Sequence, residues 1–186
     1  MPTMAKIRPK WDGLFVFLCV ARLSPQKGID LLLQAFARGF SGSSDVRLRL
    51  VGDGPLLSSL QQLSARLGVA AQTDFVGRLS GPEVCAEMEA ADAFVLASKY
   101  ESFGVVVIEA LACGLPVVST ASGGPDHLVD SSNGLLVPPG DMQALRDALL
   151  QMRCRASSYD RVAIRADVIG RYGPDAFARQ FAAMIS

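Results

Sequence analysis

The chain has little of what metal centres and nucleic-acid-binding surfaces require. Among its 186 residues there is one histidine, and the four cysteines are widely separated without a CxxC pair, so no metal site of His and Cys ligands is expected. Its 18 basic and 18 acidic side chains give a net charge of zero, without the basic block that nucleic-acid binding normally leaves. We therefore expect neither a bound metal nor a nucleic-acid partner.

Long apolar runs are also missing. The longest uninterrupted run, residues 14–21, and shorter ones such as residues 105–108 are far short of the roughly 20 residues of a membrane-spanning helix. We expect no transmembrane segment and interpret residues 1–13 as a linker rather than a signal peptide. The cysteines are interpreted as reduced core thiols, which are typical of a cytoplasmic protein. The alternative is a protein held peripherally at the cytoplasmic face of a membrane.

Several motifs of common enzyme classes are absent from the sequence. No GxGxxG follows a predicted strand, which argues against a nicotinamide or flavin site, and no GxxxxGK[ST] indicates a P-loop. There is no GxSxG turn for a nucleophilic serine. There is also no Asp-x-Asp pair that could hold a divalent ion on a diphosphate, so we expect no cofactor beyond the substrate itself.

Short β-rich runs alternate with longer helical patterns, which predicts an α/β protein with a Rossmann-like parallel sheet flanked by helices. We expect one domain over residues 14–152 and a tail of C-terminal helices over residues 153–186. Several of the predicted strands are continuously apolar, as strands covered on both faces should be. The predicted strands are residues 14–20, 46–51, 73–76, 93–97, 116–119 and 135–137.

Helical segments are predicted from apolar spacing and from capping residues. A stripe of leucines that stops at Gly68 marks one helix, and the Ser80 to Glu83 spacing predicts a capping box at the start of another. Asp141 is expected to cap a further helix. The tail is predicted to form two helices broken at Gly173, and its apolar residues Phe177, Phe181 and Met184 need a surface to cover.

Two carboxylates, Glu101 and Glu109, stand eight positions apart around the predicted start of a helix. Glu109 is the only polar residue within the apolar run 105–113. If that segment is a buried helix, its charge is costly to desolvate unless a partner such as the vicinal diol of a ribose compensates it. We expect both carboxylates to face one ligand crevice. The alternative is an ion-paired glutamate near the helix start and a second one in solvent.

The loops after the strands carry residue types suited to phosphate groups, and ligands of open α/β sheets bind beyond these strand ends. Arg22 and Lys27 follow the first strand, and two such cations suit a diphosphate, with surface charge as the alternative. Glycines at Gly52 and in residues 122–125 either let the backbone approach a ligand or form tight turns. The amides at the helix start near Val105 offer a further anion site.

Six stretches in unbroken order combine these features, namely residues 21–28, 51–55, 75–78, 101–104, 109–118 and 133–141. Together they closely resemble the C-terminal, donor-binding domain of group-one, family-four retaining glycosyltransferases of the GT-B fold. The resemblance implies transfer of a sugar from a nucleotide-diphosphate sugar to a saccharide or lipid-linked acceptor with retained configuration, without a metal.

The resemblance also implies roles for individual residues. Arg22 and Lys27 would hold the donor diphosphate and stabilise its departure, and Glu101, the first glutamate of an E-x7-E signature, would orient the donor sugar. Glu109, the second glutamate, would bind the ribose hydroxyls. The remaining candidate donor-binding residues are Gly52, Arg78, Phe103, Gly104 and Val105.

Two departures from the family pattern leave other interpretations open. His127 stands where members of the family commonly carry a glutamate, and it is expected to be a helix-start residue rather than a catalytic base. The family's enzymes also have an N-terminal Rossmann domain that supplies the acceptor site, so we expect it as a missing domain or as a partner subunit. The alternatives are a non-catalytic nucleotide-sugar-binding subunit and a degenerate gene product, with an NAD-dependent enzyme ranked below them.

Overall fold

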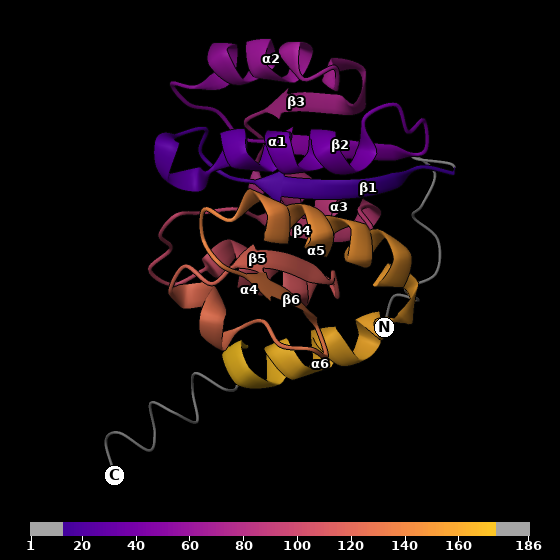
Figure 1. Cartoon of the computed structure of the whole chain (residues 1–186). Helices are drawn as coiled ribbons and strands as arrows, with labels where there is room; N and C mark the ends of the chain where they lie inside the picture. Colours follow the sequence, from indigo (N-terminus) through magenta and orange to yellow (C-terminus); the bar gives the residue numbers. More distant parts are fainter. Residues whose placement is uncertain (1–12, 174–186) are drawn as a thin grey trace.

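The computed structural model describes residues 13–173, and over this range strands and helices alternate along the chain (Figure 1). Each strand predicted from the sequence is present, with bounds shifted by no more than a residue or so. The strands are β1 (Phe15–Val20), β2 (Val46–Val51), β3 (Thr73–Gly77), β4 (Ala93–Leu96), β5 (Val117–Thr120) and β6 (Gly134–Val137).

These strands form one six-stranded sheet in the order β3-β2-β1-β4-β5-β6, and every neighbouring pair is parallel. β1 lies between β2 and β4, so the strand order reverses direction there. β4 is buried along its whole length, as expected of a strand covered on both faces. The predicted α/β class with a Rossmann-like sheet is confirmed, and the reversal at β1 and β4 is the place where such sheets bind ligands.

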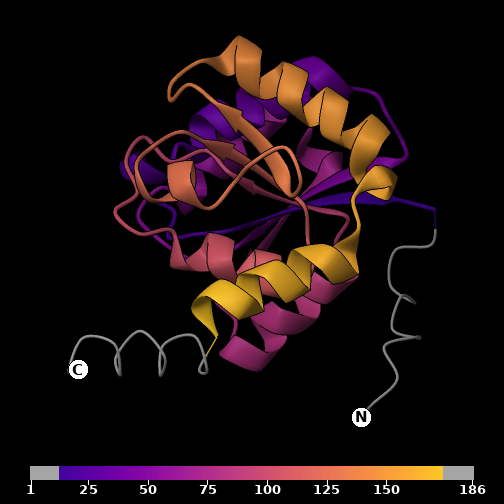
Figure 2. The same cartoon turned by 90° about the horizontal axis from the view of Figure 1, so that it is seen from below.

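Helices cover both faces of the sheet in two layers (Figure 2). Each layer encloses its own cluster of buried apolar side chains against one face. The first layer consists of α1 (Ile29–Phe40), α2 (Leu57–Arg66) and α5 (Met142–Arg155), and the second of α3 (Gly81–Ala90), α4 (Val105–Ala112) and α6 (Arg161–Tyr172). None of the helices within residues 13–173 has both the length and the hydropathy needed to cross a bilayer.

The predicted helix ends are confirmed by their hydrogen bonds. The Ser80 backbone N–H donates to Glu83 Oε2 at 2.8 Å and starts α3, as the capping box predicts. Asp141 Oδ1 accepts from the Ala144 N–H at 2.9 Å and caps α5. After α2, Gly68 adopts a left-handed conformation with φ +73°.

The C-terminal segment packs as part of the same body. The boundary expected after residue 152 falls inside α5, which continues to Arg155. Ile164 and Val168 of α6 are 5% and 2% exposed, and both belong to the apolar cluster that includes residues of α4. The second predicted tail helix, with Phe177, Phe181 and Met184, lies outside the described residues.

The interpretation of all four cysteines as core thiols is wrong for two of them. Cys19 on β1 is buried, and burial raises the pKa of its thiol to about 12 despite a nearby Lys27 charge. Cys113 is half-buried, whereas Cys85 and Cys154 are exposed on α3 and α5. Apolar neighbours in the sequence therefore did not determine which face of each helix carries its cysteine.

Candidate functional site

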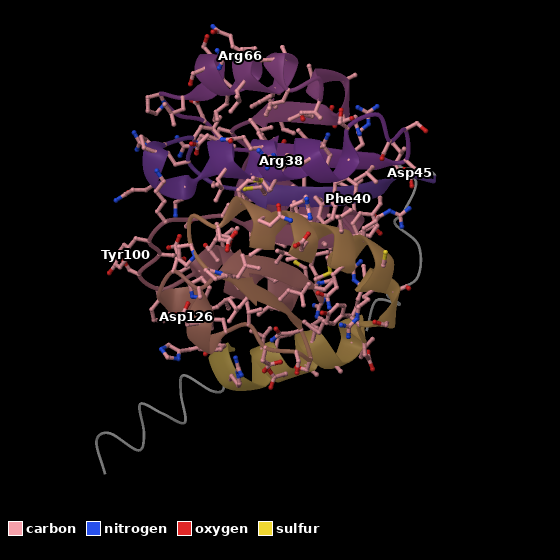
Figure 3. The ribbon with its side chains drawn as sticks, in the orientation of Figure 1. Arg38, Phe40, Asp45, Arg66, Tyr100 and Asp126 are labelled. Atoms are coloured by element: carbon pink, nitrogen blue, oxygen red, sulfur yellow. The ribbon has the colours of Figure 1, made fainter. Side chains whose placement is uncertain are left out.

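The candidate residues gather on the side of the molecule at which the parallel strands end. Tyr100 and Asp126, from the loops after β4 and β5, lie on this side, and Asp45, which precedes β2, lies on the opposite side (Figure 3). Because all strands run in the same direction, the loops after β1, β2, β4 and β5 meet at one edge. That edge brings the predicted site residues together from distant parts of the sequence.

The loop after β1 carries Arg22 and Lys27 and is held against the end of β4. Gln26 O accepts from the Lys99 N–H at 2.8 Å, which fastens the two loops to each other. At Gly28, φ is +60° and a Cβ atom would lie 2.1 Å from Ala97 O, so only glycine allows this approach. Lys27, at the end of the 3-10 helix η1 (Pro25–Lys27), is thereby fixed beside the loop that follows β4.

Lys27 and Glu101 form an ion pair across this junction. Lys27 Nζ donates to Glu101 Oε2 at 2.5 Å, and the two side chains are 24% and 16% exposed. The residues are 74 positions apart in sequence, so only the fold brings these two predicted residues together. The ammonium and the carboxylate satisfy each other, and the pair holds a cation in position at the strand ends.

The loop after β5 supports Glu101 through its backbone. The Glu101 N–H donates to Ser122 O at 2.9 Å, and Glu101 O accepts from the Gly124 N–H at 2.7 Å. Gly123 has φ +118°, and a Cβ atom there would lie 2.8 Å from Glu101 O. The glycine pair, interpreted from the sequence as a flexible approach to a ligand, thus serves mainly to hold Glu101 in place.

Arg22, Gly52 and Arg78 line one cleft of about 610 Å³ between the loops after β1, β2 and β3. Both arginines are exposed. The cleft also has an apolar wall formed by Val84 of α3 and Val106 of α4, which sequence reasoning missed because each belongs to an ordinary apolar helix pattern. Asp53 and Leu79, likewise missed, also line the cleft beside the predicted residues.

Gly52 has a different role from the one the sequence suggested. Its φ is +135°, and a Cβ atom would lie 1.9 Å from Ala21 O, in the loop after β1. Gly54 similarly faces Leu23 O, at 2.4 Å from its would-be Cβ. These glycines allow two loops of the protein to touch backbone to backbone, and in this way they form the floor of the cleft rather than leaving room for a ligand.

The start of α4 presents backbone amides beside the ion pair. Gly104 is buried with φ +77° and is the N-cap of α4, whereas Phe103 and Val105 are 64% and 56% exposed. The first amides of a helix lack acceptors within the helix and carry the positive end of its dipole. The first amides of α4 therefore remain free to donate hydrogen bonds.

The prediction that Glu109 is buried among aliphatic side chains is wrong. Glu109 is exposed, because α4 turns Val107, Ala110 and Leu111 toward the core and this position away from it. Its charge carries no burial cost that a ligand would need to offset. The structure matches the alternative of one ion-paired glutamate, here Glu101, and a second one in solvent.

Glu109 is nevertheless close along α4 to a residue of the cleft. Val106 lines the cleft, and residues three positions apart on a helix are neighbours on its surface. Glu109 therefore lies one helical turn along α4 from the apolar wall of the cleft. Within residues 13–173 no ion pair of Glu109 is found.

His127 is the last residue of the 3-10 helix η3 (Gly124–His127) and is exposed beside the Gly123 loop. It ends this short helix rather than starting one, which corrects the expected position. Asp126 Oδ1, one residue earlier, accepts from the Gly123 N–H at 3.1 Å and fastens the loop. Across residues 13–173, no three side chains of His, Cys, Asp or Glu come together as metal ligands would.

Comparison with known proteins assigns this arrangement to one family. A sequence model described as "Glycosyl transferases group 1" matches residues 2–165. Among similar proteins, a GDP-mannose-dependent alpha-(1-6)-phosphatidylinositol monomannoside mannosyltransferase of Mycolicibacterium smegmatis is 35% identical over 72% of this chain and 37% of its own length. A GDP-mannose-dependent alpha-mannosyltransferase of Mycobacterium tuberculosis is 35% identical over 90% of this chain and 42% of its own length.

Solved structures show the same likeness in three dimensions. The Anabaena protein Alr3699/HepE, determined in complex with UDP and glucose, is similar with a TM-score of 0.82 and 29% identity. The similarity covers 93% of this chain and 48% of that one. The chain thus spans less than half the length of the relatives it matches here.

Proposed function

Because the chain belongs to the group 1 glycosyltransferases, we propose that it is the donor-binding half of a retaining enzyme of this family. The donor would be a nucleotide-diphosphate sugar and the acceptor a saccharide or a lipid-linked group. The names of relatives that use GDP-mannose, and the UDP and glucose complex of a structural neighbour, support this donor class.

The observation that carries the proposal is the contact of Lys27 with Glu101 at the reversal point of the sheet. There, Lys27, Arg22 and the first amides of α4 would stabilise the negative charge that develops on the departing diphosphate. Glu101 would hold the donor sugar, its orientation set by the hydrogen bonds of its backbone to Ser122 and Gly124. No metal is assigned, since the sequence has no Asp-x-Asp pair.

Calorimetric titration of the full chain with UDP, GDP and ADP and their sugars tests the proposal. We expect at least one of them to bind, and Lys27→Ala to weaken that binding about tenfold or more, because a hydrogen bond to a charged group contributes about 1.5–3 kcal/mol. The control is Arg38→Ala, which removes an exposed cation from the last turn of α1. Absence of binding at millimolar concentration for all three nucleotides would refute the donor-binding role.

A second titration addresses Glu109. Glu109→Ala should weaken nucleotide binding if this carboxylate accepts hydrogen bonds from the ribose hydroxyls. The free energy of unfolding should change by no more than about 0.5 kcal/mol, since the side chain is exposed. The matched control is Glu89→Ala, which removes an exposed carboxylate of α3 that does not line the cleft. Equal affinities of the Glu109 variant and the unchanged chain would argue against ribose binding.

A non-catalytic nucleotide-sugar-binding subunit is the second candidate. Both candidates predict nucleotide binding, so they are separated by sugar transfer. Transfer that is recovered when a protein supplying the acceptor-binding half is added supports the catalytic role, and binding without transfer in the reconstituted complex supports the subunit.

A further inference from the structure

Two cysteine thiols lie side by side in the second helix layer. Cys85 belongs to α3 and Cys113 directly follows α4, and their sulfur atoms are 3.9 Å apart although 28 positions separate them in sequence. We propose that Cys85 and Cys113 form a dithiol modification site that is reversibly oxidised to an intrachain disulfide by exchange with a small-molecule disulfide.

The positions of the two cysteines favour closure of this bond. A disulfide has an S–S length of about 2.05 Å, so the sulfur atoms need to approach each other by only about 2 Å. Cys113 is the C-cap of α4, where the chain leaves the helix, and Cys85 is exposed with solvent around its side chain. The remaining approach of the two sulfur atoms is short, and the exposed Cys85 side chain has room to rotate toward Cys113.

The difference in exposure sets the order of the steps. Burial, together with the neighbouring Cys85 and Glu89, raises the pKa of the Cys113 thiol to about 12, and the charge of Arg165 opposes them. Cys85 is the accessible thiol and reacts first. The Cys85 thiol loses a proton to water, and the resulting thiolate attacks one sulfur of oxidised glutathione. The S–S bond of glutathione breaks, and one glutathione leaves as a thiolate that takes up a proton.

Cys113 then resolves the mixed disulfide. It loses its proton and attacks the Cys85 sulfur, the bond from Cys85 to glutathione breaks, and the second glutathione departs. The two cysteines have lost two electrons, and one oxidised glutathione has become two thiols. A reducing thiol reverses the same steps.

The disulfide would link two helices that form the wall of the cleft. Val84, the residue before Cys85, and Val106 of α4 both line that cleft. Oxidation would therefore fix these two helices to each other beside the cleft. The inference depends on the positions of the thiols and not on the proposed sugar transfer.

Treatment of the full chain with oxidised glutathione, followed by intact-mass measurement under non-reducing conditions, tests the site. A Cys154→Ser background removes the other exposed thiol, and Cys19 is buried. We expect the product to be lighter by two hydrogen atoms, without bound glutathione, and peptide mapping to join Cys85 to Cys113. Dithiothreitol should restore the original mass.

The matched variant is Cys113→Ser in the same background, which keeps Cys85 but removes the resolving thiol. This variant should retain one glutathione on Cys85. In the parent chain, Cys154 should likewise retain a bound glutathione, because no second thiol resolves it. A glutathione that persists on Cys85 while Cys113 is present would overturn the inference. Disulfides that form only between two chains, or a Cys85 that does not react, would also overturn the inference. Peptide mapping of the parent chain detects each of these outcomes even if a variant folds poorly.

Discussion

Gly52 is a single residue on which the geometry of the cleft depends. Its N–H donates to Gly77 O at 2.8 Å, and its missing side chain lets Ala21 O approach. The ends of β1, β2 and β3 are therefore fixed to one another at this residue. The φ of +135° adds a conformational demand that other residues rarely meet.

Gly52→Ala should lower the free energy of unfolding by about 2 kcal/mol or more, because the new Cβ would meet Ala21 O at 1.9 Å and the backbone would be strained. Gly42→Ala is the matched control, with φ +83° and no atom within 4 Å of the added Cβ. Backbone strain alone should reduce its stability by about 1 kcal/mol. Equal losses in chemical denaturation would contradict a role for the close approach at Gly52.

For single residues, the local sequence predicted that a position is special but not which contact it makes. The sequence identified Gly52 and Gly123 as special because glycines after strands are informative, but their partners are main-chain atoms of other loops, 1.9 Å and 2.8 Å from the would-be Cβ. Glu109 was expected to be buried because its neighbours are apolar, and the angular position on α4 decided otherwise. Local composition does not fix which side of a short helix faces the core.

At the scale of elements, α3 depends on its first turn. The Glu83 carboxylate accepts hydrogen bonds from the Ser80 hydroxyl and then from the Ser80 N–H, and these lower the pKa of Glu83 below its ordinary value. A carboxyl with a lower pKa in the folded state stabilises the fold fully above its unfolded pKa. That contribution is lost as the pH falls through the pKa that Glu83 has in the folded state.

The pH dependence of α3 can be measured with Glu83→Ala. At neutral pH this variant should unfold at a lower temperature than the parent chain, and the difference should shrink as the pH is lowered below about 4. Ser80→Ala, which removes the hydroxyl but keeps the backbone donor, should lose a smaller part of the same dependence. A difference in unfolding temperature that stays constant from pH 7 to acid would show that Glu83 does not stabilise α3 through its charge.

At the scale of the whole molecule, α6 closes the second layer. Arg161 Nη1 of α6 donates to Ala91 O after α3 at 3.1 Å, and Gly114 after α4 lies against Arg161 O, 2.4 Å from its would-be Cβ. Ile164 and Val168 are buried in the cluster shared with α4. The tail is thus joined to the region that carries the start of α4 and the wall of the cleft.

Ile164→Ala should reduce the free energy of unfolding of the entire domain by about 2–4 kcal/mol, since it leaves a cavity at a side chain that is 5% exposed. Val162→Ala, two residues away on the same helix and 76% exposed, should change stability by no more than about 0.5 kcal/mol. Denaturation followed by both fluorescence and circular dichroism checks whether unfolding stays a single transition. A separate transition for α6 would mean that the tail is not part of the cooperative unit.

By itself, the sequence determined the order and class of the elements. The hydrophobic period, the Ser80 and Asp141 caps and the apolar strands are local signals, and each acts through residues a few positions apart. The sequence also placed Arg22, Lys27 and Glu101 beyond strand ends, because parallel strands bring all such loops to one edge.

Only the tertiary structure decided which of these residues meet. The alignment of β1 with β4 determines that Lys27 meets Glu101. The rotation of the helices on the sheet determines that Cys85 meets Cys113 and that Glu109 is exposed. Strand alignment and helix rotation are set by many buried contacts between residues that are far apart in the sequence. No stretch of a few residues contains the information that fixes them.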